Sequence, residues 1–368
     1  MNETNGSAQP EFRSAEEAVG WITGRMKFGI RPGLARMELM MEKLGHPHRR
    51  LKFIHVAGTN GKGSTCAFLT KALVQCGYDV GTFTSPYIER YQNRIQYNGR
   101  DIDDESLVSL ANTIKPVFDE IAATEWGAPT MFEVSTALAI LYFAKVAYPD
   151  FVVWETGLGG RLDSTNIVTP IVSVITNVGH DHMEILGDTL EQIASEKAGI
   201  IKPGVPVVSA AEQPEVIEVL RRTAAERKST LYLLNEAYRF EPVSSMLDKQ
   251  TLNFSGPFRE LANVDIAMNG AHQLKNASVA LMTLEVLRQY YAVVLDDEPL
   301  HEAMRTAQWP GRLEMVSHSP RLLLDGAHNP EGAETLAEAL RTIYRYDKLH
   351  MMIAMMPTKR HDGVLKAL

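Results

Sequence analysis

A glycine-rich run that carries a single lysine constrains the fold of this chain more than any other feature. It reads Gly58-Thr-Asn-Gly-Lys-Gly-Ser64, follows an apolar, β-branched stretch at 53–56 and precedes a helix-like stretch at 66–75. A strand that leads through a glycine loop into a helix offers backbone N–H groups and a helix N-terminus to a polyphosphate. The pattern therefore predicts a bound nucleoside triphosphate. A glycine-rich turn without a ligand is the alternative, but a lysine flanked by glycines at a helix start is costly unless an anion offsets it.

The loop departs from the common phosphate-loop pattern at two positions. Val56 stands where that pattern has its first glycine, and Gly63 stands directly after the lysine, where the pattern has serine or threonine. The hydroxyl residues follow one position later, as Ser64 and Thr65. Because kinases, GTPases, ATPases and ligases all use such loops, other polar motifs have to distinguish among these classes.

Length and composition limit the protein to a few classes. At 368 residues the chain is expected to form two or three domains, and its hydrophobic fraction of 45% and charged fraction of 22% are typical of soluble globular proteins. A net charge of −8 argues against a broad nucleic-acid surface. The two cysteines, Cys66 and Cys76, suit a reducing compartment. Since no signal peptide or apolar run of ~18 residues is present, we expect a cytoplasmic protein with neither membrane nor nucleic acid as partner.

Strand-like and helix-like apolar patterns alternate along most of the chain. The stretches expected as strands are 53–56, 79–84, 150–155, 171–176, 205–209, 230–234 and 322–324. Those expected as helices are 14–26 with Ser14 as N-cap, 37–44, 130–146, 190–198, 215–227, 276–291 and one that begins at Glu331. This alternation predicts an α/β fold with a doubly wound, mostly parallel sheet. We also expect an antiparallel excursion at 235–265, a linker at 309–312 and disorder at 1–12.

A carboxylate ends one of the expected buried strands. Glu155 follows the apolar run 151–154 and precedes the glycine-rich stretch 157–160. The carboxyl ends of parallel strands open onto one crevice, so Glu155 is expected beside the phosphate loop, where it would hold Mg²⁺ that bridges the phosphates. The alternative is a carboxylate that caps the amides of residues 157–160.

Two further polar stretches are less specific. His180, Asp181 and His182 follow the expected strand 171–176, and spacing alone does not choose between the two histidines as a metal ligand. Lys197 lies near the end of the helix expected at 190–198, just before Gly199 and Pro203. From the residues alone it is a lysine favoured by the helix dipole.

Eight motifs, taken together and in order, resemble one family. They are Gly58-Thr-Asn-Gly-Lys-Gly-Ser64, Thr84-Ser85-Pro86-Tyr87, Glu155-Thr-Gly-Leu-Gly-Gly-Arg161, Gly179-His-Asp-His182, Glu196-Lys-Ala-Gly-Ile-Ile-Lys202, Gly270-Ala-His-Gln273 with Asn276, Trp309-Pro-Gly-Arg312 and Asp325-Gly-Ala-His-Asn329. The chain is similar, over about residues 15–356, to folylpolyglutamate synthases, including the bifunctional dihydrofolate synthase form, within the Mur ligase superfamily.

The resemblance implies an ATP-dependent amide ligase, expected as a monomer. ATP would phosphorylate the carboxylate of folate or dihydropteroate, and the amine of L-glutamate would attack the acyl phosphate, with two Mg²⁺ ions neutralising the approach of the anions. It also implies an ATP-binding domain over residues 1–308 and a smaller, partial Rossmann-like glutamate-ligase domain over 309–368, with a linker that allows closure and excludes water.

Residue roles follow from the resemblance position by position. Those implied for the nucleotide are Thr59, Asn60, Gly61, Lys62, Gly63, Ser64, Asn276, Arg312 and Asp325. Those implied for metal are Ser85, Glu155, His182 and a carbamylated Lys197. His328 would face the ligation site, so the catalytic set is Lys62, Glu155, His182, Lys197 and His328. Those implied for the folate are Pro86, Tyr87, Arg90, Arg94, Phe132 and the segment 27–36.

Two departures leave alternatives open. The stretch after Arg312 is short for the family's second domain, and residues 355–362 stand where the family has an Asp-Lys-Asp run. A Mur-type peptidoglycan ligase is disfavoured by Gly63 and by the start of the chain, which lacks a UDP-binding domain. A nucleotide-binding protein without ligase activity is the alternative from another class. The sequence does not choose between dihydrofolate synthase, folylpolyglutamate synthase and both.

Overall fold

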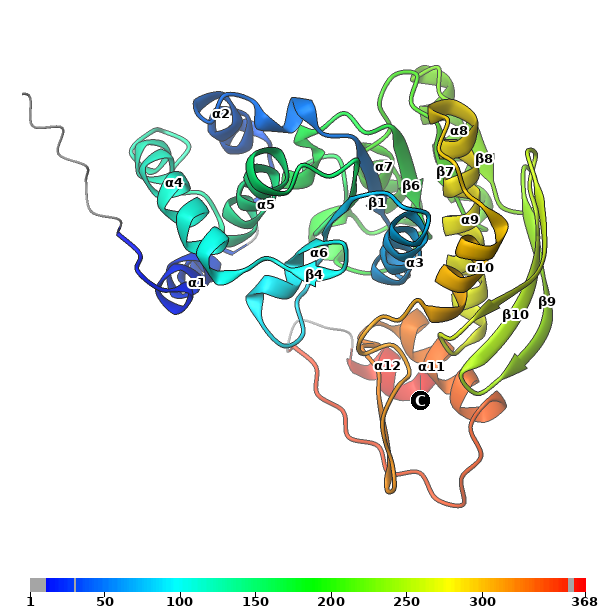
Figure 1. Ribbon diagram of the computed structural model, residues 1–368. Coiled ribbons are helices and arrows are strands. Elements are labelled where there is room, and N and C mark those ends of the chain that lie inside the picture. The colour runs from blue at the N-terminus through cyan, green and yellow to red at the C-terminus, as the bar shows by residue number, and fades with distance from the viewer. Residues whose placement is uncertain (1–10, 30, 357–360) are drawn as a thin grey trace, which may run out of the picture.

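The centre of the molecule is an eight-stranded sheet (Figure 1), and the computed structural model describes residues 11–29, 31–356 and 361–368. The strands lie in the order β4-β3-β2-β5-β1-β6-β7-β8. Their bounds are β1 Phe53–Ala57, β2 Val80–Phe83, β3 Ile95–Tyr97, β4 Arg100–Asp101, β5 Phe151–Glu155, β6 Val172–Ile175, β7 Val207–Ser209 and β8 Leu231–Leu233. The run from β2 to β8 is parallel throughout, which confirms the predicted sheet. An antiparallel edge formed by β3 and β4 was not predicted.

Alternate residues of the central strand face different layers of helices. Ile54 and Val56 of β1 join the apolar cluster of α3 (Lys62–Gln75), α9 (Ala271–Tyr291) and α10 (Asp297–Thr306). Phe53 joins the cluster on the other face, which α1, α2, α4 and α5 cover. The helices of that layer are α1 Ala15–Thr23, α2 Ala35–Lys43, α4 Asp104–Ala122 and α5 Met131–Tyr142. Helices α7 Leu190–Ala198 and α8 Pro214–Glu226 belong to a third apolar cluster, which also contains residues of the central sheet. Burial on both faces explains why β1, apart from the buried His55, and β5, up to Glu155, are apolar without a polar alternation.

A second, antiparallel sheet lies on the outer side of α9 and α10 (Figure 1). Its strands are β9 Arg239–Met246, β10 Lys249–Ser255 and β11 Glu260–Ile266. Leu252, Phe254 and Leu261 face inward and belong to the same apolar cluster as α3 and α9. The antiparallel excursion expected at 235–265 is confirmed.

The described N-terminal residues pack against the helical layer. Ser14 caps α1 as predicted, since its Oγ accepts a hydrogen bond from the Glu17 N–H at 3.3 Å. Residues 1–10 lie outside the described chain, but the expected disorder is wrong for Phe12, which is buried and lies 5.2 Å from the ring of Trp21. Helix α4 was not predicted. The remaining short helices are η1 Gly24–Phe28, η2 Pro47–Arg50, η3 Tyr91–Arg94, η4 Phe143–Ala147, η5 Ser164–Ile167 and α6 Met183–Leu186.

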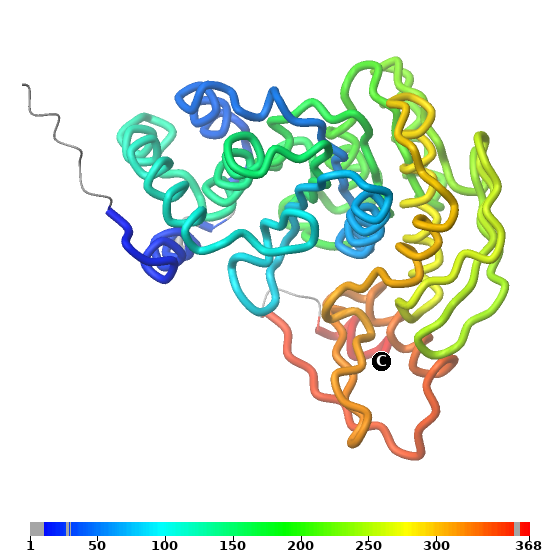
Figure 2. The backbone as a smooth tube through the Cα atoms, viewed as in Figure 1, coloured from blue at the N-terminus to red at the C-terminus, as the bar shows by residue number. Residues whose placement is uncertain are grey.

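The described residues after 308, here called the C-terminal unit, form a small layer of their own. Strands β12 (Glu314–His318) and β13 (Arg321–Leu324) pair antiparallel, and helices α11 (Pro330–Thr342) and α12 (His361–Ala367) follow. Leu313, Leu340 and Tyr344 form its apolar cluster. The strand–loop–helix pattern expected at 322–331 is therefore present. In the tube view the unit lies below α9, which α11 contacts (Figure 2). Across the described chain, no helix combines the length and apolarity needed to cross a membrane.

Candidate functional site

A cavity of about 490 Å³ opens at the carboxyl ends of the parallel strands. The loops after β1, β2, β5 and β6 form its walls, as expected for ligand sites in open α/β sheets. α7 and the C-terminal unit complete it. The residues of the implied catalytic and metal sets that line it are Lys62, Ser85, Glu155, His182, Lys197 and His328. The structure thus brings together all of these residues, which are spread over much of the chain.

The phosphate loop is held by close contacts that only glycine allows. A Cβ at Gly58 would overlap the Thr176 side chain, and a Cβ at Gly61 would overlap Asn276. Gly61 also has a φ of +83°, a region that other residues rarely adopt. The Nζ of Lys62 donates hydrogen bonds to the carbonyl oxygens of Gly58 at 3.0 Å and Thr59 at 3.3 Å. The lysine therefore lies across the loop that would receive the phosphates.

Gly63, one of the two residues that depart from the common pattern, lies against the linker. A Cβ at this position would be 2.6 Å from Nε1 and 2.8 Å from Cε2 of Trp309. The indole of the Trp309-Pro-Gly-Arg312 segment therefore occupies the space that a serine or threonine would need. The departure is a packing requirement between the phosphate loop and the linker.

We expect Gly63→Ala to destabilise the protein by roughly 1–3 kcal/mol, because the added methyl group overpacks against the Trp309 ring. Gly20→Ala is the matched control: it lies inside α1, where a Cβ meets no atom within 4 Å. The control should be neutral or stabilise by about 0.5–1 kcal/mol, since glycine disfavours a helix interior. Urea unfolding of both variants makes the comparison, and equal shifts of the two midpoints would contradict the packing explanation.

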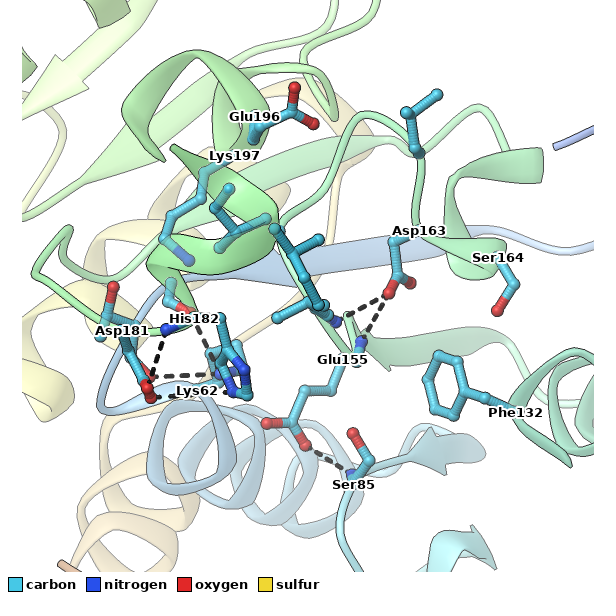
Figure 3. Close-up of a pocket in the computed structure, with 18 of the residues that line it drawn as sticks. Lys62, Ser85, Phe132, Glu155, Asp163, Ser164, Asp181, His182, Glu196 and Lys197 are labelled. Atoms are coloured by element: carbon cyan, nitrogen blue, oxygen red, sulfur yellow. Dashed lines mark hydrogen bonds and ion pairs between the residues drawn. The ribbon is translucent and has the colours of Figure 1, made fainter. Parts of the chain in front are cut away.

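Glu155 is a buried carboxylate at the end of β5. It is 2% exposed, and its Oε2 accepts a hydrogen bond from the Ser85 N–H at 2.9 Å (Figure 3). Burial raises the pKa of Glu155, and the positive charge of Lys62 opposes that rise. Ser85 and Glu155 are thus neighbours beside the phosphate-loop lysine, as the resemblance implied.

The amides after Glu155 are capped by another carboxylate. The Oδ2 atom of Asp163 accepts hydrogen bonds from the N–H groups of Gly157 at 3.1 Å and Leu158 at 2.8 Å. The alternative that assigned this cap to Glu155 is therefore wrong, and the Glu155 side chain faces the cavity. Sequence reasoning missed Asp163, although its position in the same short loop was a usable signal.

Of the two histidines left open, His182 lines the cavity and His180 does not. His182 is the N-cap residue of α6, with a φ of +52°, and its backbone N–H donates to Oδ1 of Asp181 at 3.0 Å. The Nε2 atom of His182 lies 3.9 Å from Oδ2 of Asp181. From the C-terminal unit, Nε2 of His328 lies 3.6 Å from the same oxygen. Asp181 therefore links the two histidines at one end of the cavity.

Lys197 is a buried amine on the cavity wall. It is 3% exposed, and Figure 3 shows it reaching from α7 toward Asp181 and His182. Burial lowers its pKa to about 7, and the charge of Lys62 adds to that effect. A substantial fraction of the side chain is therefore neutral near pH 7, which is not the state of a solvated lysine that interacts with a helix dipole.

The loop of Glu155 and the helix of Lys197 are joined directly. The Nη2 atom of Arg161 lies 2.7 Å from Oε1 of Glu196, and Nδ2 of Asn166 donates to the carbonyl oxygen of Gly199 at 3.1 Å. A Cβ at Gly160 would lie 2.8 Å from the Glu196 carbonyl oxygen. These contacts fix the two walls of the cavity relative to each other.

The residues expected to contact folate divide into two groups. Pro86, Arg94 and Phe132 line the cavity, together with Gly29 and residues 31–33 of the segment expected at 27–36. Ile30 and the side chains of Lys27 and Phe28 lie outside the described parts of the chain. Arg94 is 5% exposed, and its Nε and Nη1 atoms have no hydrogen-bond partner.

The other two expected folate residues do not line the cavity. Arg90 is largely exposed, and its Nη2 atom lies 2.9 Å from Oδ2 of Asp101. The ring of Tyr87 packs under the Arg94 guanidinium at 5.0 Å. Tyr87 therefore supports Arg94, and the structure does not support a substrate contact for Arg90.

Most of the residues implied for the nucleotide line a second, smaller cavity of about 260 Å³, whereas Thr59, Lys62 and Gly63 line the larger one. The smaller cavity lies between the phosphate loop, α9 and the C-terminal unit, and the implied residues that line it are Asn60, Gly61, Ser64, Asn276, Arg312 and Asp325. Gln273 bridges two of these, since its Nε2 donates to Ser64 Oγ at 3.1 Å and its Oε1 accepts from Asn276 at 3.0 Å. Asn60, Gly61 and Arg312 line both cavities, so the two cavities share part of the phosphate loop and one residue of the linker.

Comparison with known proteins agrees with this geometry. Residues 56–284 match the Mur ligase middle domain, and residues 311–368 match the Mur ligase glutamate ligase domain. A dihydrofolate synthase/folylpolyglutamate synthase of Bacillus subtilis is 43% identical over 357 residues, which are 97% of this chain and 83% of that protein.

Two solved structures show the same fold. The folylpolyglutamate synthase (FPGS) of Thermotoga maritima has a TM-score of 0.86 and 35% identity over 96% of this chain and 80% of that one. The FPGS of Mycobacterium tuberculosis, complexed with ADP and AMPPCP, has a TM-score of 0.89 and 30% identity over the same shares of the two chains. The motifs, the cavity they build and these likenesses agree, and the chain belongs to the dihydrofolate synthase/folylpolyglutamate synthase family of Mur ligases.

Proposed function

We propose that this protein is an ATP-dependent ligase that joins L-glutamate to the carboxylate of a folate or of dihydropteroate. The observation that carries the proposal is a single cavity that combines a phosphate loop, a buried carboxylate and a buried lysine with groups from the C-terminal unit. A carboxylate is a poor electrophile until one of its oxygens becomes part of a phosphate leaving group. The arrangement therefore fits a reaction that first activates a carboxylate and then captures it with an amine.

The phosphate side of the cavity supports the first step. The acceptor carboxylate attacks the γ-phosphorus of ATP, the bond to the β-phosphate breaks, and ADP leaves with the bonding electrons. The loop amides, Lys62 and Arg312 offer donors and positive charge where negative charge develops on the phosphates. In the second step the glutamate amine attacks the acyl carbon, phosphate leaves, and the amine loses a proton. His328 lines the cavity from the C-terminal unit, where that amine would enter.

Mg²⁺ fits the donors present at this site. No cluster of three or more histidine, cysteine, aspartate or glutamate side chains suitable for a metal is found in the described residues. Such a cluster is not required, because Mg²⁺ in phosphate-transfer sites takes one or two carboxylates, waters and the phosphate oxygens themselves. Ser85 and Glu155 would hold one ion, and His182 with a carbamylated Lys197 would hold a second. Bound there, the ions would neutralise charge between the phosphates and the acceptor carboxylate.

Carbamylation of Lys197 is supported by its surroundings. The neutral amine attacks the carbon of CO₂ and loses one proton, which gives a carbamate with two oxygen ligands in place of a cation. A buried lysine with a lowered pKa meets the requirement for a neutral amine. The nearby Lys62 and the metal would offset the new negative charge.

The acceptor side of the cavity fits a folate-like carboxylate. The Arg94 guanidinium has a buried Nε and Nη1 without hydrogen-bond partners, and Phe132 offers an aromatic face in the same cavity. We propose that Arg94 binds an acceptor carboxylate and that Phe132 packs against the aromatic part of the acceptor.

The same proposal includes three further statements about the protein. It has one domain over 1–308 and a second over 309–368, it is cytoplasmic, and it is a monomer.

The test is phosphate release with ATP, Mg²⁺, L-glutamate and either dihydropteroate or a reduced folate. We expect release that depends on both the acceptor and glutamate, with one amide product formed for each phosphate. Activity with dihydropteroate alone would assign dihydrofolate synthase, activity with the folate alone would assign folylpolyglutamate synthase, and activity with both would assign the bifunctional form. Nucleotide binding without release under any of these conditions would contradict the ligase assignment.

A further inference from the structure

Two asparagine side chains connect the phosphate loop to the C-terminal unit. The Nδ2 atom of Asn329 donates to Oδ1 of Asn60 at 3.0 Å, and Nδ2 of Asn60 donates back to Oδ1 of Asn329 at 3.3 Å. The same Nδ2 of Asn329 lies 3.4 Å from Oδ2 of Asp181, the carboxylate that links the two histidines of the cavity. Asn329 is 3% exposed, so these bonds are shielded from water.

The backbone of Asn60 is hydrogen-bonded to two residues that follow β6. Its backbone N–H donates to Oδ1 of Asn177 at 2.8 Å, and its carbonyl oxygen accepts from the Thr176 hydroxyl at 2.6 Å. Both partners follow β6 in the central sheet. The amide pair therefore connects the C-terminal unit, through one side chain of the phosphate loop, to the rigid sheet.

Asn329 has a second role, as the cap of a helix. It is the N-cap of α11, where its Oδ1 accepts a hydrogen bond from the Gly332 N–H at 2.8 Å. The cap needs only the oxygen, whereas the bonds to Asn60 Oδ1 and Asp181 need the Nδ2 donor. A substitution that keeps an oxygen and removes the nitrogen therefore breaks the bonds donated by Nδ2 and leaves an acceptor for the cap.

We propose that Asn329 is a positioning residue that locks the C-terminal unit onto the phosphate loop while the acyl phosphate exists. The inference rests on the proposed ligase function and adds to it a specific contact that keeps water from the intermediate. Without the lock the unit opens more often, and water competes with the glutamate amine for the acyl carbon. The expected signature is a loss of coupling between phosphate release and amide formation.

The test compares Asn329→Ser and Asn329→Asp with the unchanged protein. Both substitutes keep an oxygen for the α11 cap, so thermal midpoints should stay close to that of the unchanged protein. Both lose the Nδ2 donor, and the aspartate adds a like charge beside Asp181. We expect kcat for amide formation to fall roughly 5- to 30-fold, more for aspartate than for serine, while the KM for ATP changes little. The ratio of phosphate released to amide formed should rise above one.

A double-mutant cycle tests the contact from its other side. If the amide pair carries the effect, Asn60→Ser combined with Asn329→Ser should cost less than the sum of the two single substitutions. Variants that keep a ratio of one and the original kcat, or effects that add fully, would overturn the proposal. A fall in the thermal midpoint with the ratio unchanged would leave only the capping role and would also overturn it.

A measurement that needs no ligation separates this inference from the proposed function. With the ATP analogue AMPPCP bound, amide hydrogen exchange over residues 325–342 should be slower in the unchanged protein than in Asn329→Ser. If the unchanged protein ligates neither acceptor but shows this difference, the function is wrong and the lock stands. If it ligates normally and the exchange rates are equal, the lock is wrong and the function stands.

Discussion

Lys62→Ala is expected to lower kcat for glutamate ligation by at least about 100-fold, because it removes the one full positive charge of the phosphate loop. In the structure the Lys62 Nζ donates to two carbonyl oxygens of its own loop, Gly58 and Thr59, so its charge lies over the loop that would receive the phosphates. The fold should survive, since Lys62 opens α3 and alanine is a good helix former. Steady-state kinetics and a thermal unfolding curve measure the two effects separately.

Lys71→Ala is the matched control for this prediction. Lys71 lies further along the same helix, carries the same charge and is absent from both cavities. Its substitution should leave kcat within about twofold of the original value, as expected for a surface change away from the site. If Lys62→Ala retained normal turnover, or if both variants lost activity equally, the phosphate-loop assignment would be wrong.

The sheet and the edge where the site lies could be predicted from local pattern. The parallel strands are short apolar runs with polar residues directly after them, and the rule that such ends meet at one edge placed Glu155 beside Lys62. The structure confirms that neighbourhood: both residues line one cavity, and the charge of Lys62 acts on the pKa of Glu155. Pattern was sufficient here because the periodicity of the strands and the position of the carboxylate are both local properties of the chain.

Contacts between segments that are far apart in the sequence could not be predicted from local sequence pattern. Asn60 and Asn329 are 269 positions apart, and nothing in either motif indicates that their amides pair. In the sequence Gly63 is a departure from a common motif, and the position of the Trp309 ring in the structure explains it. The sequence predicts that Arg90 could bind a substrate carboxylate, because it does not show that Asp101 already pairs with this arginine. In each case the decisive partner comes from tertiary packing and lies outside the motif.

Lys197 is the residue whose interpretation changes most, and its carbamylation leads to the second large prediction. Lys197→Ala should lower kcat by at least about 100-fold, because it removes the amine that would supply oxygen ligands to a metal ion. In the unchanged protein, activity should fall after CO₂ is removed and recover when bicarbonate is added. Bicarbonate should not restore Lys197→Ala, since that variant has no amine to modify.

Lys202→Ala distinguishes this site from a general effect of a buried lysine. Lys202 follows the same helix, burial also lowers its pKa, and its Nζ lies 3.4 Å from the Asn166 carbonyl oxygen without lining the cavity. In ¹³C NMR with labelled bicarbonate, the carbamate signal should be present in the unchanged protein and in Lys202→Ala and absent in Lys197→Ala. A signal that persists in Lys197→Ala would place the carbamate elsewhere. Full activity of the CO₂-depleted enzyme would show that an unmodified lysine at position 197 is sufficient.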